Sequence, residues 1–304
     1  MERILGEYGE YNSGKLFIIF AGIHGNEKAG IKALSRIFEF FNENNIVFKG
    51  KLIALAGNVE ALESNQRFLH KDLNRQWYDA KIKKLSALPF GMLNTSEDKE
   101  QIQILHEIQN IFLQQKDKKD VFMIDLHTTS AAGACMTITN SHKDSVDYAR
   151  MLPVPVITEM TNILSGTTLE YFENMDIPAI AYEAGQHDDP ESIERVKYGL
   201  MSLFLKSNTI DSKYNEMFAE GIEKLRLYNA GLPYVVNVKY HHPIDEEDEF
   251  VMKKGFSNFQ KIVKGELLAQ DVKGKVLSPN NGLILMPLYQ KKGSDGFFIV
   301  EKES

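Results

Sequence analysis

Short apolar runs alternate with amphipathic stretches through the first two thirds of the chain. Four runs have the continuous apolar character of strands buried on both faces of a parallel sheet, at 16–20, 52–58, 121–127 and 179–183. Apolar residues recur at helical spacing in three longer stretches, at 29–42, 97–115 and 191–206. Strands that alternate with helices predict an α/β fold, a three-layer sandwich around a mixed, mainly parallel sheet.

The pattern changes after about residue 210. A helical stretch at 213–228 is followed by short strand-like runs separated by Gly, Pro and Asn, at 234–238, 261–265, 282–286 and 296–300. We therefore expect two domains, one over 1–210 and a C-terminal one over 211–304 in which a linker helix precedes a small all-β barrel or sandwich. The acidic run 245–249 lacks the spacing of a calcium loop, and we interpret it as a solvated loop.

Composition narrows the classes of partner. The 304 residues carry a net charge of −7, which argues against a nucleic-acid partner. No apolar run approaches the ~20 residues that span a bilayer, and the N-terminus lacks the apolar core of a signal peptide. We expect a cytoplasmic protein with no membrane partner, and a homo-oligomer is compatible with the sequence. The single cysteine, Cys135, precludes an intrachain disulfide and is expected to be packed and inert.

Histidines and a carboxylate follow two of the predicted buried strands. His24 and Glu27 come directly after the first strand, and His127 ends the third. The carboxyl ends of parallel strands meet at the crevice where open α/β sheets bind ligands. Imidazole and carboxylate groups suit zinc, although a lone histidine at a strand end is also typical of a satisfied core residue. Asp125 lies on the same strand face as His127, where it would orient that ring or line the pocket floor.

Two further segments bear on chemistry. The loop 65–75 holds Arg67, Asp72, Asn74 and Arg75, a set that suits an anion clamp and equally a surface loop of salt bridges. The fourth strand ends in Glu183, followed by Ala and Gly, where a carboxylate would be a plausible general base for activated water.

Together these segments resemble a known family. His24-Gly25-Asn26-Glu27, Asp72-Leu73-Asn74-Arg75, Asp125-Leu126-His127-Thr128-Thr129 and Glu183 resemble the motifs of the succinylglutamate desuccinylase/aspartoacylase family, relatives of the zinc carboxypeptidases. The resemblance spans about residues 15 to 190, and the appended β unit fits the family's two-domain plan.

The resemblance implies a role for each motif. His24, Glu27 and His127 would bind one zinc ion per chain and leave an open position for water. Glu183 would accept the proton of that water and pass it to the leaving nitrogen. Arg67 would polarise the scissile carbonyl.

It also implies how the substrate is held. Asn74 and Arg75 would hold the carboxylate of the amino-acid part, and Asp72 would orient its neighbours. Tyr289 would reach into the pocket from the β unit. In one respect the chain departs from the family, because residues 151–182 contain no Arg, Lys or His to grip an acidic side chain. We therefore expect a neutral pocket for the substrate's side chain.

These observations favour a zinc-dependent hydrolase that cleaves the amide bond of a small N-acyl amino acid or a related carboxylate. Two alternatives remain at this point. One is carboxypeptidase-like or peptide amidase activity on short peptides, since the same metal and arginine geometry serves both. The other is a non-catalytic zinc- or carboxylate-binding protein, against which Glu183 argues because a binding protein needs no general base.

Overall fold

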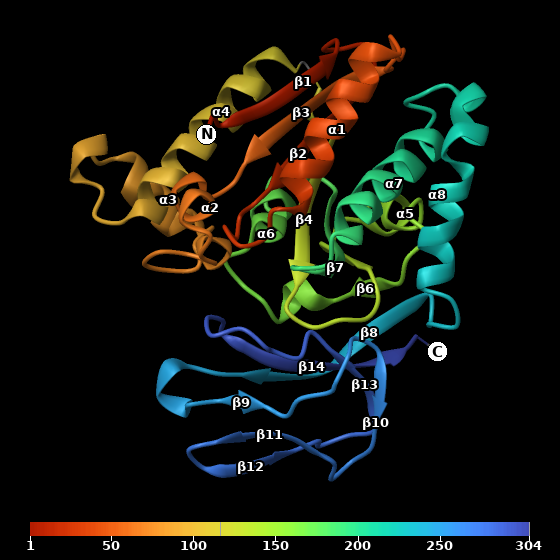
Figure 1. The fold of residues 1–304 in the computed structure, drawn as a ribbon. Helices are drawn as coiled ribbons and strands as arrows, with labels where there is room; N and C mark the ends of the chain where they lie inside the picture. Colours follow the sequence, from red (N-terminus) through yellow and green to blue (C-terminus); the bar gives the residue numbers. More distant parts are fainter. Residues whose placement is uncertain (116, 304) are drawn as a thin grey trace.

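The computed structural model describes residues 1–115 and 117–303 (Figure 1). The strands are β1 (Ile4–Gly9), β2 (Lys15–Ala21), β3 (Gly50–Ala56), β4 (Val121–Thr129), β5 (Met136–Thr139), β6 (Val156–Thr158), β7 (Ala179–Gln186), β8 (Val235–Pro243), β9 (Val251–Met252), β10 (Gln260–Ile262), β11 (Leu267–Asp271), β12 (Gly274–Leu277), β13 (Gly282–Leu285) and β14 (Asp295–Lys302). The α-helices are α1 (Ala29–Glu43), α2 (Val59–Ser64), α3 (Asp79–Ser86), α4 (Ser96–Gln114), α5 (Ser145–Ala149), α6 (Thr168–Glu173), α7 (Glu191–Lys206) and α8 (Asn215–Tyr228).

A large central sheet organises the molecule. Its strand order is β1-β3-β2-β4-β7-β5-β6-β8-β14-β13-β10. β2 pairs in parallel with β3 and β4, and β4 pairs in parallel with β7. These strands carry apolar side chains on both faces. Helices cover each face of a parallel sheet, so both sets of side chains are buried. The predicted three-layer α/β sandwich is confirmed.

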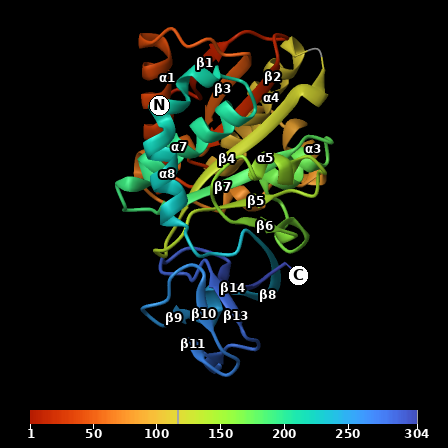
Figure 2. The same cartoon turned by 90° about the vertical axis from the view of Figure 1, so that its right-hand side faces the viewer.

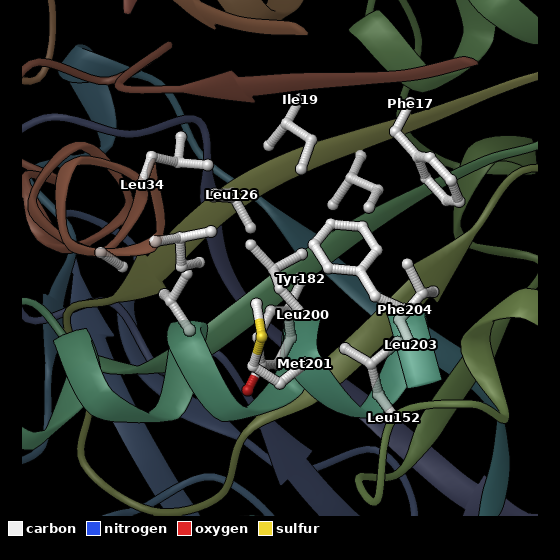
Figure 3. Packing of buried hydrophobic residues seen from close by; sticks show 14 of the residues in the cluster. Phe17, Ile19, Leu34, Leu126, Leu152, Tyr182, Leu200, Met201, Leu203 and Phe204 are labelled. Carbon is white, nitrogen blue, oxygen red and sulfur yellow. The ribbon is translucent and has the colours of Figure 1, made fainter. Parts of the chain in front are cut away.

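Two hydrophobic cores lie on opposite faces of the sheet. Successive β2 side chains alternate between them: Phe17 and Ile19 belong to one core, and Ile18 and Phe20 to the other. Helices α1 and α7 pack on the first face, where Figure 3 shows Phe17, Leu126 and Phe204 among the packed side chains. α4 and α6 cover the second face. Because the side chains on both faces of β2 are buried, its sequence is one unbroken apolar run.

Four of the C-terminal strands, β8, β14, β13 and β10, extend the central sheet. β8 pairs in parallel with β6 and antiparallel with β14, so the sheet passes from the α/β part into the C-terminal part (Figure 2). β12, β11 and β9 form a small separate antiparallel sheet. The helix α8, predicted as a linker, places Phe218 and Leu225 in the same core as α7. The domain boundary at 210/211 stays a prediction.

Most of the differences from the sequence-based expectation concern short elements. The strand carrying His127 continues two residues further, to Thr129, so His127 lies inside β4. Short strands such as β5 and β6 escaped detection because three or four residues are too few to establish a period.

Three other expectations can be compared with the structure. Cys135 is buried, and burial raises the pKa of its thiol to about 12, as expected for an inert cysteine. The acidic run forms a 3₁₀ turn capped by Asp245, with most of its residues exposed. None of the helices in the described ranges is long and apolar enough to cross a membrane.

The first core predicts the outcome of a truncation. Phe204 is fully buried on α7, with its ring centroid 5.3 Å from those of Phe17 and Phe48. Phe204→Ala removes a large buried ring and leaves a cavity, so we expect the free energy of unfolding to fall by about 3–5 kcal/mol. Phe90→Ala is the matched control, because Phe90 is 48% exposed. Denaturant unfolding of both variants checks this, and equal losses would contradict the assignment of Phe204 to the core.

Candidate active site

The turn after β2 carries the first two candidate ligands. Gly22 has φ +74°, which lets the chain leave the strand sharply, and His24 and Glu27 follow before α1 begins. Gly25 approaches the α2 backbone so closely that a Cβ there would lie 2.1 Å from the carbonyl carbon of Ala61. The Gly25 amide also donates to the carbonyl oxygen of Arg67. Close backbone packing therefore fixes the turn and the direction of its side chains.

His24, Glu27 and His127 converge at the carboxyl ends of β2 and β4. Their candidate ligand atoms all lie within 4.8 Å of one another, and all three residues are buried. The Glu27 Oε1 atom is 2.8 Å from His24 Nδ1, and its Oε2 atom is 3.0 Å from His127 Nδ1. The Thr128 amide also donates to Glu27 Oε2. Within the described part of the chain, this is the one cluster of at least three such residues arranged to hold a metal ion.

Each imidazole also contacts a second carboxylate through its Nε2 atom. His24 Nε2 donates to Asp72 Oδ1 at 3.1 Å, and His127 Nε2 lies 3.0 Å from Asp125 Oδ2. Thr168 donates to the same Asp125 oxygen at 2.6 Å. A carboxylate behind a histidine is the arrangement that orients metal-ligating imidazoles and increases their basicity.

The chemistry of the donor set fits a divalent ion. With each Nε2 atom directed at a carboxylate, both Nδ1 atoms face the Glu27 carboxylate, so two imidazole nitrogens and one carboxylate converge. Burial raises the pKa of Glu27, but the neighbouring charges of His24 and His127 hold it well below its usual range. Two histidines and one carboxylate are an established ligand set for catalytic zinc.

Arg67 is held beside the triad by two carboxylates. Its Nη1 atom donates to Glu27 at 3.3 Å, and its Nη2 atom donates to Asp72 at 3.1 Å. The loop that carries it is anchored by the fully buried Glu97 at the start of α4, which accepts from the backbone amides of Leu69 and His70. Arg67 therefore reaches the cavity in a defined orientation.

Glu183 faces the triad from the neighbouring strand. It lies directly opposite His127 in the β4–β7 register. The residue is 7% exposed, and its Oε2 atom is buried with no hydrogen-bond partner among the described residues. Burial raises the pKa of this carboxyl to about 8, against the opposing effect of the His127 charge. A carboxyl with these properties is poised to exchange protons near neutral pH.

Asn74 and Arg75 lie on the 3₁₀ turn Leu73–Arg75, next to the triad. Asp72 caps this turn by accepting from the Asn74 amide at 2.9 Å. The Asn74 side chain accepts from the Thr168 amide. Arg75 donates from Nη1 to the Asn74 carbonyl and from Nη2 to Asp295 of the C-terminal part at 2.6 Å.

A cavity of about 870 Å³, part of it open to solvent, joins these groups. His24, Glu27, His127, Arg67, Asn74, Arg75 and Glu183 all line it. Apolar residues from both parts of the chain also line it: Ile138, Met160, Leu164, Leu169, Met286, Leu288 and Phe298. Asp72 and Asp125 lie behind the lining, in contact with the histidines.

The structure does not place Tyr289 in this cavity. Its hydroxyl donates to the carbonyl of Lys253 and accepts from the amide of Phe256, so the side chain is satisfied within the C-terminal part. Its neighbours Leu288 and Gln290 line the cavity instead. The prediction of a substrate-binding role for Tyr289 therefore has no geometric support.

Several residues of the site carried no signal in the sequence. Thr168 and Glu97 act only through contacts across the fold, and each stands in ordinary helix-starting sequence. Asp295 lies more than 200 positions from Arg75, and nothing in its neighbourhood marks it as part of the site. A charged residue at a strand start is unremarkable until the fold supplies its partner.

The comparisons with known proteins agree with this geometry. A model of the succinylglutamate desuccinylase/aspartoacylase catalytic domain matches residues 13–201. The chain is 31% identical over 138 residues to a probable aspartoacylase from Acaryochloris marina, an alignment covering 44% of this chain and 42% of that protein. It is 24% identical over 264 residues to a succinylglutamate desuccinylase from Pseudomonas putida, covering 84% of this chain and 72% of the relative.

A solved structure gives the same result for the fold. The succinylglutamate desuccinylase/aspartoacylase from Rhodobacter sphaeroides superposes with a TM-score of 0.68 at 15% identity, covering 97% of this chain and 87% of that one. At this identity the likeness concerns the fold alone. The first curated relatives align over less than half of their own length, so the family assignment depends on the domain model. Because that model matches more than half of the chain, the chain belongs to the succinylglutamate desuccinylase/aspartoacylase family.

Proposed function

We propose that this protein is a zinc-dependent amidohydrolase that removes the acyl group from a small N-acyl amino acid or a related carboxylate. One observation carries the proposal: the His24, Glu27 and His127 donors, the unpartnered Glu183 carboxyl and the Arg67 guanidinium line the same cavity. Family membership supports hydrolysis of an amide bond as the reaction class.

His24, Glu27 and His127 would hold the metal. A zinc ion bound by this set supplies Lewis-acid activation of water and of a carbonyl oxygen. Asp72 and Asp125 keep the two imidazoles oriented for this task, so their contribution is geometric.

Side chains of the protein carry out the remaining steps. Glu183 takes the proton of the attacking water on its free Oε2 atom and transfers it to the nitrogen of the departing amine. Arg67 stabilises the negative charge that develops on the carbonyl oxygen, because its guanidinium is already fixed beside the site. Asn74 and Arg75 hold the amino-acid part of the substrate.

The cavity also sets limits on the substrate. Residues of the C-terminal part close one side of it, which favours a small substrate over an extended peptide. The residues that line it from 151–182 are all uncharged. An apolar or uncharged side chain is therefore the better fit.

The first test concerns the metal. Protein purified without chelator should contain one zinc ion per chain, and His24→Ala should lose it because one of three donors is removed. His106→Ala is the control, since that histidine is exposed on α4. Elemental analysis gives the stoichiometry. Full activity in metal-free protein would refute the proposal.

The second test concerns proton transfer. Glu183→Gln should retain the zinc content of the wild type while turnover falls by on the order of 10²–10⁴, the usual scale for loss of a positioned acid/base. Steady-state kinetics on metal-analysed protein separates the two effects. Near-normal turnover in this variant would assign the proton to another group.

The third test concerns the side-chain pocket. An acidic side chain buried there without a partner loses hydration, which is costly for a charge. We expect kcat/KM for N-acetylated Ala, Leu and Met to exceed that for N-acetylated Asp and Glu by at least about tenfold, equivalent to ~1.4 kcal/mol. A side-by-side hydrolysis assay measures this ratio. Equal or faster hydrolysis of the acidic pair would show that a cation reaches the pocket.

A further inference from the structure

Asp295 of the C-terminal part holds one end of the cavity. It lies at the start of β14, at an irregularity in the pairing with β8. One carboxylate oxygen accepts from Arg75 at 2.6 Å, and the other accepts from His241 at 2.8 Å. Ser294 donates to the oxygen that faces Arg75. Asp295 also lines the cavity, as Arg75 does, so this pair is within reach of a bound substrate.

The pair is built into the fold. The Asp295 and Arg75 side chains are 16% and 20% exposed. Burial raises the pKa of Asp295, but the His241 hydrogen bond and the Arg75 charge lower it to about 2, so the carboxylate is charged. The His241 ring stacks on Phe298 with 4.6 Å between centroids, which fixes the histidine that steadies Asp295.

The charge balance of the cavity follows from these contacts. Of the described residues lining it, Arg67 and Arg75 are the permanent cations. Arg67 pairs with Glu27 and Asp72, and Arg75 pairs with Asp295. A free carboxylate that binds Arg75 therefore meets a guanidinium that already has an anionic partner, and it meets a like charge beside it.

We propose that Asp295 is a specificity-determining residue that cancels the charge of Arg75, so that the site accepts an uncharged group at this end nearly as well as a carboxylate. The inference rests on the proposed deacylase function and specifies its substrate class further: N-acyl amino acids and their uncharged amides. Arg75 still has donors beyond those used by Asp295 and the Asn74 carbonyl, and these can hold a carbonyl oxygen of either kind.

Two substrates that differ in one group test the proposal. We compare kcat/KM for removal of the acetyl group from N-acetyl-leucine and from N-acetyl-leucinamide. In the wild type, we expect the carboxylate to be favoured by less than tenfold. In Asp295→Asn, which keeps the shape but removes the charge, the same ratio should rise at least tenfold, about 1.4 kcal/mol. A wild-type ratio of tenfold or more, or a smaller change in the variant, overturns the proposal.

The ratio is insensitive to a general loss of active protein, because both substrates are assayed on one preparation. Should Asp295→Asn fail to fold, the wild-type ratio still decides. Asp248→Asn removes one acidic charge from the C-terminal part at an ion pair with Lys273, outside the cavity lining, and should leave the ratio within threefold. His241→Gln keeps the Asp295 charge and should do the same. A tenfold rise in either control would show that the effect is not due to the charge at Asp295.

Failure of the proposed function would have a different signature. If the wild type hydrolyses neither these two compounds nor the other N-acetyl amino acids of the third test, the deacylase proposal fails for acetylated substrates, and calorimetric binding of leucine and leucinamide replaces kinetics. The ratio of their dissociation constants is then judged by the same thresholds in the wild type and in Asp295→Asn. The role of Asp295 is thereby tested independently of turnover.

Discussion

The arrangement of this protein depends on one buried carboxylate. Glu27 lies between two imidazoles and also accepts a backbone amide and an arginine. A charge so deeply buried is costly unless each lone pair is satisfied, and removal of one partner from such a cluster leaves the others uncompensated. The turn after β2 and the end of β4 must therefore be held in register. The tightly packed glycines of the turn and the parallel β2–β4 pairing provide this restraint.

From Glu27, a continuous series of contacts leads into the C-terminal part. Asp72 joins His24 and Arg67 and caps the 3₁₀ turn on which Asn74 and Arg75 lie. Arg75 then contacts Asp295, whose strand belongs to the same continuous sheet. The groups from Glu27 to Asp295 are thus parts of one electrostatic network. A change of charge at one group of this network therefore alters the electrostatic interactions of groups that do not contact it directly.

The elements with strong periodicity could be predicted, and so could the residues at their ends. The unbroken apolar runs ending near His24, His127 and Glu183 placed all three at one sheet edge, because parallel strands bring their carboxyl ends together. The order of motifs along the chain then supplied the family and with it Arg67, Asn74 and Arg75. These assignments used local sequence, one topological rule and the resemblance to a known family.

What escaped prediction depends on pairing between distant segments. A small C-terminal β barrel or sandwich was expected, but the sequence did not indicate that β8 would pair in parallel with β6, a three-residue strand too short to leave a pattern. Tyr289 was assigned to the pocket by its position in the chain, yet its hydroxyl finds two backbone partners elsewhere.

The same limit explains why the sequence indicated only some of the charged contacts at the cavity. Counting cations in 151–182 showed that this segment supplies no Arg, Lys or His. It could not indicate that Arg75 would meet Asp295, since a salt bridge between strand and loop has no sequence signature. Both features act in the same direction and lower the positive charge available to a substrate. The candidate metal ligands and Glu183 thus lie in the α/β part, whereas Asp295, which pairs with Arg75, comes from the C-terminal strands. If the proposed function holds, substitutions in those strands can alter substrate choice while His24, Glu27, His127 and Glu183 stay in place.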